Sequence, residues 1–212
     1  AAGECACVSV HGANRLGANS LVSCVFGGMR AASTSERYLS GLKTCAADSD
    51  SSLFDTAKRK FVGKFDGLKK QTGNENAFKI WNELGDWMRE NCTIIRHNDK
   101  LAKTENKIVE LMDRYNNIGM NDSSGYSNQP LLFTHQLWNM LVLSRVMVKG
   151  ALLRDESRGA HYKPAFPERD DSRFLKTTIA DFKGAKEAPA ISYEEVNTSL
   201  ITPRKRDYSK KD

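Results

Sequence analysis

The stretch with the most chemical potential runs from His11 to Leu21 and holds two glycines, one arginine and the start of a helix. Gly12 and Gly17 can take positive φ angles or let a ligand approach the backbone closely. Arg15 carries a planar guanidinium that can grip a carboxylate through two parallel hydrogen bonds. Together, these residue types predict half of a binding site for an anionic ligand.

A helix is expected to begin directly after this turn, with Asn19 or Ser20 as its cap. Apolar residues then recur at helical spacing, at Leu21, Val22, Val25, Phe26 and Met29. The start of a helix presents N–H groups and partial positive charge, so it suits an anion or an electron-rich ring edge. By spacing alone, an ordinary turn ahead of an apolar helix has the same composition and is the commoner case.

Length and charge narrow the classes of function. The 212 residues suffice for one or two domains, and no apolar run is long enough to span a bilayer. The net charge of +6 is concentrated at residues 58–70 and 204–211. Neither basic segment is interleaved with aromatic residues for base stacking, so we expect solvated or partner-docking surfaces and no nucleic-acid partner.

The cysteines and the N-terminus indicate a reduced compartment and a longer parent protein. Five cysteines make an odd number without paired metal spacing, which favours free thiols in a cytosolic compartment and no metal site. The first residues do not read as a secretory signal, and the chain begins without Met. We therefore expect a piece of a longer polypeptide. The dinucleotide motif G-x-G-x-x-G does not occur in it.

The run Gly3–Val10 and the following run His11–Leu21 resemble the segment that closes the FAD domain in the flavoprotein subunit of succinate dehydrogenase and fumarate reductase. The resemblance implies that Arg15 binds a carboxylate of succinate or fumarate. It also implies three residues that bind the FAD cofactor: Glu4, Ser20 and Leu21. No catalytic residue is assigned, because the proton-transfer arginine of the family belongs to an earlier part of the polypeptide.

His11 opens the same motif and carries two possible roles. A lone histidine on a packed turn usually has a local hydrogen-bond partner, so we expect a structural role. A contact with the substrate is the alternative.

The resemblance also implies partners and a location. Electrons would pass to an iron–sulfur subunit and then, through a cytochrome b membrane anchor, to quinone. Ala18 and the run Gly27–Met29 resemble the menaquinone-linked bacterial form, so we expect a peripheral subunit on the cytoplasmic, inner face of the cell membrane. The phosphate-binding loop, the covalent flavin histidine and the capping domain would lie in the N-terminal part of the same subunit. Alone, the chain is expected neither to hold FAD nor to turn over succinate.

The chain is expected to be mainly α-helical. Residues 1–45 would end an FAD-binding α/β domain, 46–158 would form a bundle of about four helices, and 159–212 would form a small region with a β-hairpin and a basic tail. Asn74 and Asp99 are the expected caps of the second and third bundle helices, and Pro130 fits the first turn of the fourth. Strands are expected at 175–182 and 190–196.

The segment 156–171 contains two prolines, a glycine and closely alternating charges. This composition predicts an ordered loop held by ion pairs. The segment also resembles the end of the helical domain in the same flavoproteins, which implies that it pins the bundle to the FAD domain, with a contact near the active site as the alternative. No catalytic role is assigned to Arg158 or His161.

Two other functions fit parts of the sequence. L-aspartate oxidase resembles the chain around Arg15 and in the bundle, but its motif usually departs at Gly17 and Ala18, and it lacks the run Phe166–Asp171. A non-catalytic helical module that docks a partner through its basic faces would explain the missing nucleotide loop. It would not explain the retained flavin-edge motif.

Overall fold

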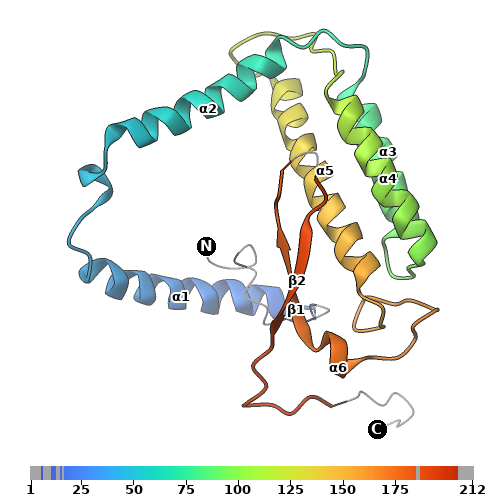
Figure 1. The fold of residues 1–212 in the computed structure, drawn as a ribbon. Coiled ribbons are helices and arrows are strands. Elements are labelled where there is room, and N and C mark those ends of the chain that lie inside the picture. Colours follow the sequence, from blue (N-terminus) through green and yellow to red (C-terminus); the bar gives the residue numbers. More distant parts are fainter. Residues whose placement is uncertain (1–5, 7–10, 13–14, 16, 185–186, 205–212) are drawn as a thin grey trace. The chain divides into compact units, whose positions relative to one another are not determined.

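The computed structural model describes residues 6, 11, 12, 15, 17–184 and 187–204. It is mainly helical, with one small antiparallel hairpin (Figure 1), as expected. The chain divides into two compact units, Ala1–Lys70 and Gln71–Asp212. The domain boundaries after residues 45 and 158 stay predictions. No helix within the described residues combines the length and the apolar character needed to cross a membrane.

The first unit consists of two helices and a short connection. Helix α1 runs over Asn19–Ser40, the 3-10 turn η2 over Ala46–Asp48 and helix α2 over Ser51–Lys69. Asp50 caps α2, since its carboxylate accepts a hydrogen bond from the Ser52 amide at 2.9 Å.

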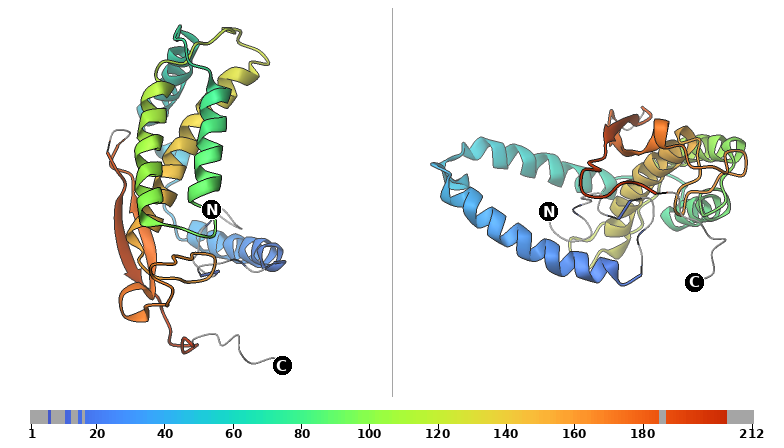
Figure 2. Two further views of the ribbon diagram at one scale, coloured as in Figure 1. Left: turned by 90° about the vertical axis from the view of Figure 1, so that its right-hand side faces the viewer. Right: turned by 90° about the horizontal axis from the view of Figure 1, so that it is seen from below.

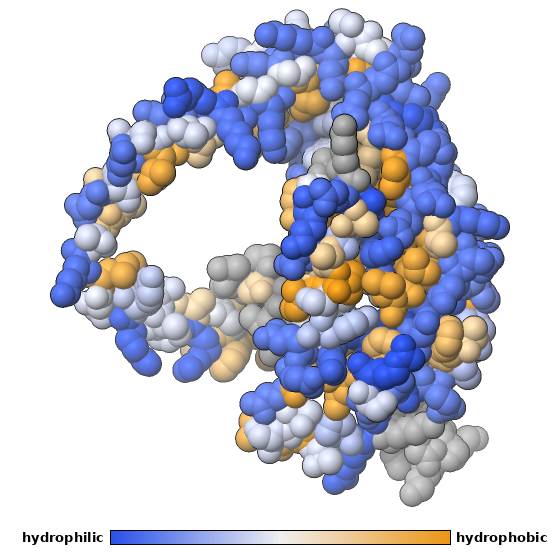
Figure 3. Space-filling model, viewed as in Figure 1, coloured by the Kyte–Doolittle hydropathy of each residue, from blue (hydrophilic) through white to orange (hydrophobic). Residues whose placement is uncertain are grey.

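The apolar faces of these two helices are largely open. No residue of α1 is buried, and in α2 only Leu68 is buried. On the face shown in Figure 3, orange residues of both helices are open to view between blue ones. The helical periodicity is therefore confirmed, but in this chain it does not build a core.

The second unit has a true core between three helices: α3 (Ala77–Asn91), α4 (Asn98–Tyr115) and α5 (Gln129–Leu153). They lie side by side in Figures 1 and 2. The largest fully buried apolar side chains come from all three helices and the loop after α4: Ile80, Leu101, Ile108, Leu111, Ile118, Leu137, Leu141 and Val148. Three of the four expected bundle helices thus pack together here, while α2 belongs to the first unit.

Helix α3 begins later than its expected cap. Asn76 is the cap, and its side-chain oxygen accepts from the amides of Phe78 at 2.9 Å and Lys79 at 3.2 Å. The prediction of Asn74 was wrong, because the residues before Asn76 pair with another loop and cannot enter the helix.

Helices α4 and α5 differ in how they begin. His97 is the N-cap of α4 and makes no capping bond through its side chain, so the prediction of Asp99 as the cap was wrong. Asp99 lies inside the first turn, where its negative charge interacts favourably with the positive end of the helix dipole. In α5, Asn128 accepts from the Leu131 amide at 2.9 Å, and Pro130 occupies the first turn as expected.

Two loops cross at one end of the α3–α4 pair. The Glu75 amide donates to the carbonyl of Asn117 at 2.9 Å, and the Gly119 amide donates to the carbonyl of Glu75 at 3.0 Å. A Cβ added to Gly73 would collide with the main-chain carbonyl of Asn117, and one added to Gly119 would collide with the main-chain carbonyl of Gly73. Both glycines are required because the two backbones touch.

The C-terminal part of this unit forms helix α6 (Asp171–Phe174) and a two-stranded hairpin beside α5 (Figure 1). Strand β1 runs over Lys176–Asp181 and pairs antiparallel with β2, which runs over Ala190–Glu195. Lys176 lies opposite Glu195 and forms an ion pair with it at 2.8 Å. The expected hairpin is confirmed.

Candidate functional site

The turn before α1 ends in an unusual backbone conformation. Ala18 is the N-cap of α1 and has a φ of 64°, in the left-handed region. Its side chain cannot cap the helix, and no side-chain capping bond is present. The prediction of Asn19 or Ser20 as the cap was therefore wrong, since both already belong to the helix.

A hydrogen bond ties the turn to the second turn of α1. His11 Nε2 lies 3.0 Å from the hydroxyl oxygen of Ser23. This local partner confirms the expected structural hydrogen bond of His11. Gly12 has a φ of 60°, which agrees with the predicted glycine-dependent turn.

The structure describes three of the four residues assigned to FAD and substrate. Arg15 is exposed on the turn, Ser20 is half-buried, and the side chain of Leu21 is 71% exposed. Glu4 lies outside the described residues. The Leu21 amide donates to the carbonyl of Ala18 at 3.1 Å. A bound group would therefore meet the positive end of the α1 dipole and not a free Leu21 amide.

A second concentration of charge follows α5, in the segment predicted to be an ion-paired loop. Glu156 is completely buried, and its carboxylate accepts four hydrogen bonds. They come from Arg154 Nη1 at 2.6 Å, Arg158 Nε at 2.8 Å, Arg158 Nη2 at 2.9 Å and the Asp170 amide at 2.9 Å. Burial alone would raise the pKa of Glu156, but these donors outweigh it and the pKa is lowered.

The same network continues to the start of α6. Asp171 accepts from Arg158 at 2.7 Å and from Arg169 at 2.7 Å. Arg169 also donates to the carbonyl of Arg204, at 2.7 Å. The predicted ordered loop, held by ion pairs, is confirmed in these contacts.

Arg154 joins the end of α5 to the hairpin, a role that sequence spacing did not reveal. Its guanidinium donates to the carbonyls of Phe174 at 2.8 Å and Lys176 at 2.9 Å, and to the hydroxyl of Thr178 at 3.1 Å. It also lies 5.7 Å from the ring centroid of Tyr193. The arginine therefore contacts α6 and both strands.

Lys163 is a buried cation within this loop, with 1% of its surface exposed. Its ammonium donates to the carbonyl of Leu152 at 3.0 Å and to the carboxylate of Asp155 at 2.9 Å. Burial lowers the pKa of Lys163, while the bond to Asp155 opposes that shift. These two bonds tie the loop to the end of α5.

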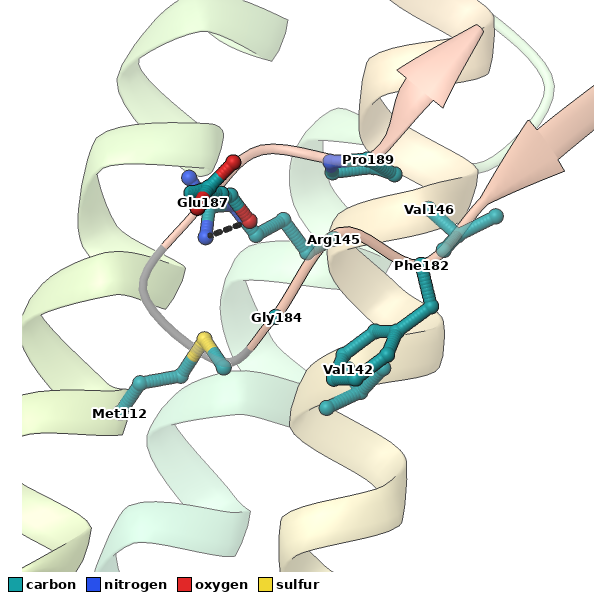
Figure 4. Close-up of a pocket in the computed structure, with 8 residues that line it drawn as sticks. All are labelled: Met112, Val142, Arg145, Val146, Phe182, Gly184, Glu187 and Pro189. Carbon is teal, nitrogen blue, oxygen red and sulfur yellow. Dashed lines mark hydrogen bonds between the residues drawn. The ribbon is translucent and has the colours of Figure 1, made fainter.

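A small pocket lies between α4, α5 and the residues that flank the hairpin turn (Figure 4), with about 230 Å³ of empty space partly open to solvent. Its lining is mainly apolar, and Arg145 of α5 is buried beside it. Arg145 Nη1 donates to the carbonyl of Glu187 at 2.9 Å. This contact fastens the hairpin to α5. An arginine among the apolar residues of α5 was the sequence signal that could have revealed it.

Within the described residues, no group of three or more His, Cys, Asp or Glu is placed to hold a metal ion.

Comparison with known proteins gives a consistent result. Residues 81–208, more than half of the chain, match the family model described as the fumarate reductase flavoprotein C-terminus. The whole chain is 53% identical to the succinate dehydrogenase flavoprotein subunit of Bacillus subtilis and covers 36% of it. It is 36% identical to the fumarate reductase flavoprotein subunit of Escherichia coli, over 98% of this chain and 34% of that one.

A solved structure of E. coli quinol fumarate reductase superposes with a TM-score of 0.87 at 34% identity, over 100% of this chain and 36% of that one. The chain thus spans about a third of the length of the relatives it matches.

Proposed function

The chain belongs to the flavoprotein subunit family of succinate dehydrogenase and fumarate reductase, and from this premise we propose that it is the C-terminal third of a subunit that interconverts succinate and fumarate. The observation that carries the proposal is the identity of 53% to a succinate dehydrogenase flavoprotein over the entire chain, the turn before α1 included. Neither the aspartate oxidase alternative nor the interaction module is favoured by this membership.

In this proposal Arg15 positions the substrate. Its guanidinium stays charged at every physiological pH, and its fork matches one carboxylate of a dicarboxylic acid. Arg15 lies exposed on a turn that the His11–Ser23 bond fastens to α1.

Glu4, Ser20 and Leu21 are the residues proposed to hold FAD, which would supply hydride transfer when bound. The geometry at the start of α1 is compatible with this role, because the helix has no side-chain cap and the Leu21 side chain is open. The positive end of the dipole would stabilise negative charge that develops on a neighbouring ring.

The wider proposal concerns partners and place. The iron–sulfur subunit, a cytochrome b anchor and a peripheral position at the inner face of the cell membrane are proposed by analogy with the relatives. A solved quinol–fumarate reductase with menaquinol molecules is 34% identical to this chain, with a TM-score of 0.84. We propose menaquinone as the quinone on that basis and on the resemblance of the α1 motif.

The decisive experiment replaces Arg15 in the complete subunit. Arg15→Gln should lower kcat/KM for succinate-dependent dye reduction by about 100-fold or more, because a charge-assisted bidentate contact is lost. Bound flavin, measured by its visible absorbance, should stay unchanged. Arg37→Gln, at the exposed far end of α1, is the matched control and should retain full activity. Equal activity of both variants would refute the role of Arg15.

A second measurement addresses the chain alone. The purified 212 residues should be colourless and inactive with succinate, because the phosphate-binding part of the cofactor site is expected elsewhere in the subunit. A yellow protein after incubation with FAD and gel filtration would contradict that part of the proposal.

A further inference from the structure

His161 is held in one protonation state by its two partners. The residue is 7% exposed and lies in the loop after α5. Its Nδ1 lies 2.7 Å from Nη1 of Arg96, which can only donate, so Nδ1 must be the unprotonated acceptor. Its Nε2 lies 2.9 Å from the carbonyl oxygen of Arg154, which can only accept, so Nε2 must carry the hydrogen. This geometry requires a neutral imidazole.

Arg96 cannot easily turn away from the ring. Its Nε donates to the carbonyl of Thr93 at 2.7 Å and its Nη2 donates to the carbonyl of Cys92 at 3.3 Å. Cys92 is the C-cap of α3 and Thr93 follows it, so both carbonyls lie just past the last residue of the helix. A proton on Nδ1 of His161 would therefore meet a guanidinium that the carbonyls of Cys92 and Thr93 hold in place.

The charges around His161 make a positive charge on its ring unfavourable. Three cationic side chains act on the ring: Arg96, Lys163 and Arg154. The neighbouring carboxylates are already engaged, Asp155 with Lys163 and Glu156 with Arg154 and Arg158. Burial is the main cause that lowers the pKa of His161, and the three cations lower it further, against the opposing bond to the Arg154 carbonyl.

The ring lies where two segments of the unit meet. The Arg96 amide donates to the carbonyl of Tyr162 at 2.9 Å, and the Tyr162 amide donates to the carbonyl of Ile94 at 3.3 Å. These bonds join the connection between α3 and α4 to the loop that carries His161. If the contact between His161 and Arg96 were lost, the short parallel pairing of Ile95 with Tyr162 would be the main link between the two segments.

We propose that the contact between His161 and Arg96 is an acid-released latch, which holds the loop 157–163 against the connection 92–97 at neutral pH and frees it in mild acid. The latch rests on contacts within the second unit alone and does not depend on the proposed enzymatic function.

The sign and size of the effect follow from proton linkage. The freed loop exposes an imidazole of ordinary pKa, about 6.5, whereas the closed loop resists protonation. The open form therefore binds more protons, and closure weakens as the pH falls below 6.5. Between pH 7.5 and pH 5.5 the opening constant should rise by up to about tenfold.

The test is residue-resolved amide hydrogen exchange on the complete chain, corrected for the intrinsic effect of pH. The amides of Arg96 and Tyr162 should become up to about tenfold less protected at pH 5.5 than at pH 7.5. The Ile108 amide, in the core of α4, should not change. Unchanged protection of Arg96 and Tyr162 would overturn the proposal.

His161→Gln is the matched variant, because glutamine can accept from Arg96 or donate to the Arg154 carbonyl but does not titrate in this range. Its protection at Arg96 and Tyr162 should change less than twofold over the same pH interval. A variant that loses protection as the wild type does would assign the effect to another group and overturn the latch. If the variant does not fold, the NMR chemical shifts of the His161 ring carbons in the wild type are followed against pH instead. Titration of the ring near pH 6.5 while the Arg96 and Tyr162 amides stay protected would refute the latch.

Discussion

The two units use the same kind of helix with opposite results. Helix α1 has 22 residues and none is buried, whereas α4 has 18 residues and six are buried. Both carry apolar residues at helical spacing. The comparison shows that periodicity predicts which face of a helix will be covered but not what covers it. In α4 the cover comes from α3 and α5, while the apolar face of α1 stays open.

The largest expected effect comes from the buried charge of the second unit. Glu156→Gln should lower the free energy of unfolding of this unit by about 3–5 kcal/mol, because two arginines lose their buried counter-charge. Urea unfolding followed by tryptophan fluorescence measures it, since all three tryptophans lie after residue 70. Glu36→Gln in α1 is the control, with an expected effect within about 0.5 kcal/mol. Similar losses of unfolding free energy in Glu156→Gln and Glu36→Gln would contradict the difference between the two units.

Truncation of an apolar side chain sharpens the comparison directly. Leu141→Ala in α5 should cost about 2–5 kcal/mol, because it opens a cavity in a fully buried position. Phe26→Ala in α1 should cost less than about 0.5 kcal/mol in this chain, since that ring is 64% exposed. Circular dichroism melts of both variants give the answer. A large loss for Phe26→Ala would mean that the chain itself covers α1.

Glycine substitutions should have opposite signs in the two units. Gly119→Ala should cost about 1–3 kcal/mol, because its Cβ would collide with the main chain of Gly73. Gly67→Ala in α2 meets no atom within 4 Å and should stabilise the helix by about 0.5–1 kcal/mol. Urea midpoints are read from fluorescence for the first variant and from helical ellipticity for the second. Equal signs would contradict the assignment of Gly119 to a close backbone contact.

The smallest expected effect is the loss of stability in strong acid, where the carboxylates of Glu83 and Glu75 that form ion pairs with Arg114 are protonated. The bond from Arg114, with that from Lys107, lowers the pKa of Glu83 to about 2, and the pKa of Glu75 is lowered by Arg114 too. A carboxylate with a lowered pKa stabilises the fold above its ordinary value near 4.5 and loses that contribution as the pH falls toward 2. The urea midpoint of the second unit should therefore drop modestly from pH 4.5 to pH 2.5. Glu83→Gln should reduce that drop, and an unaltered slope in the variant would contradict it.

Local sequence signals predicted much of the second unit. Pro130 in the first turn of α5 agreed with the structure, and so did the strands of the hairpin, because their causes lie within a few residues. The cap of α3 did not agree, since Asn74 was the expected cap and Asn76 is the observed one. Gly73 is required by the carbonyl of Asn117, a contact between residues far apart in the sequence.

The two charged regions were predictable to different degrees. Alternating charges in 156–171 predicted ion pairs, which need only short-range partners such as Glu156 and Arg158. The role of Arg154 could not be predicted, because its hydrogen-bond partners in α6 and β1 lie 20 to 24 residues away. The assignment of Arg15, Ser20 and Leu21 rests on family resemblance and stays a prediction, since a turn before a helix has the same local pattern.

Arg154 also sets an order of events during synthesis. A two-stranded hairpin alone is at best marginally stable in water. The guanidinium that fastens this one lies at the end of α5, and its last aromatic neighbour, Tyr193, is added 39 residues later. The end of α5 is therefore made before the hairpin is complete, and the hairpin can dock only after its second strand has been added.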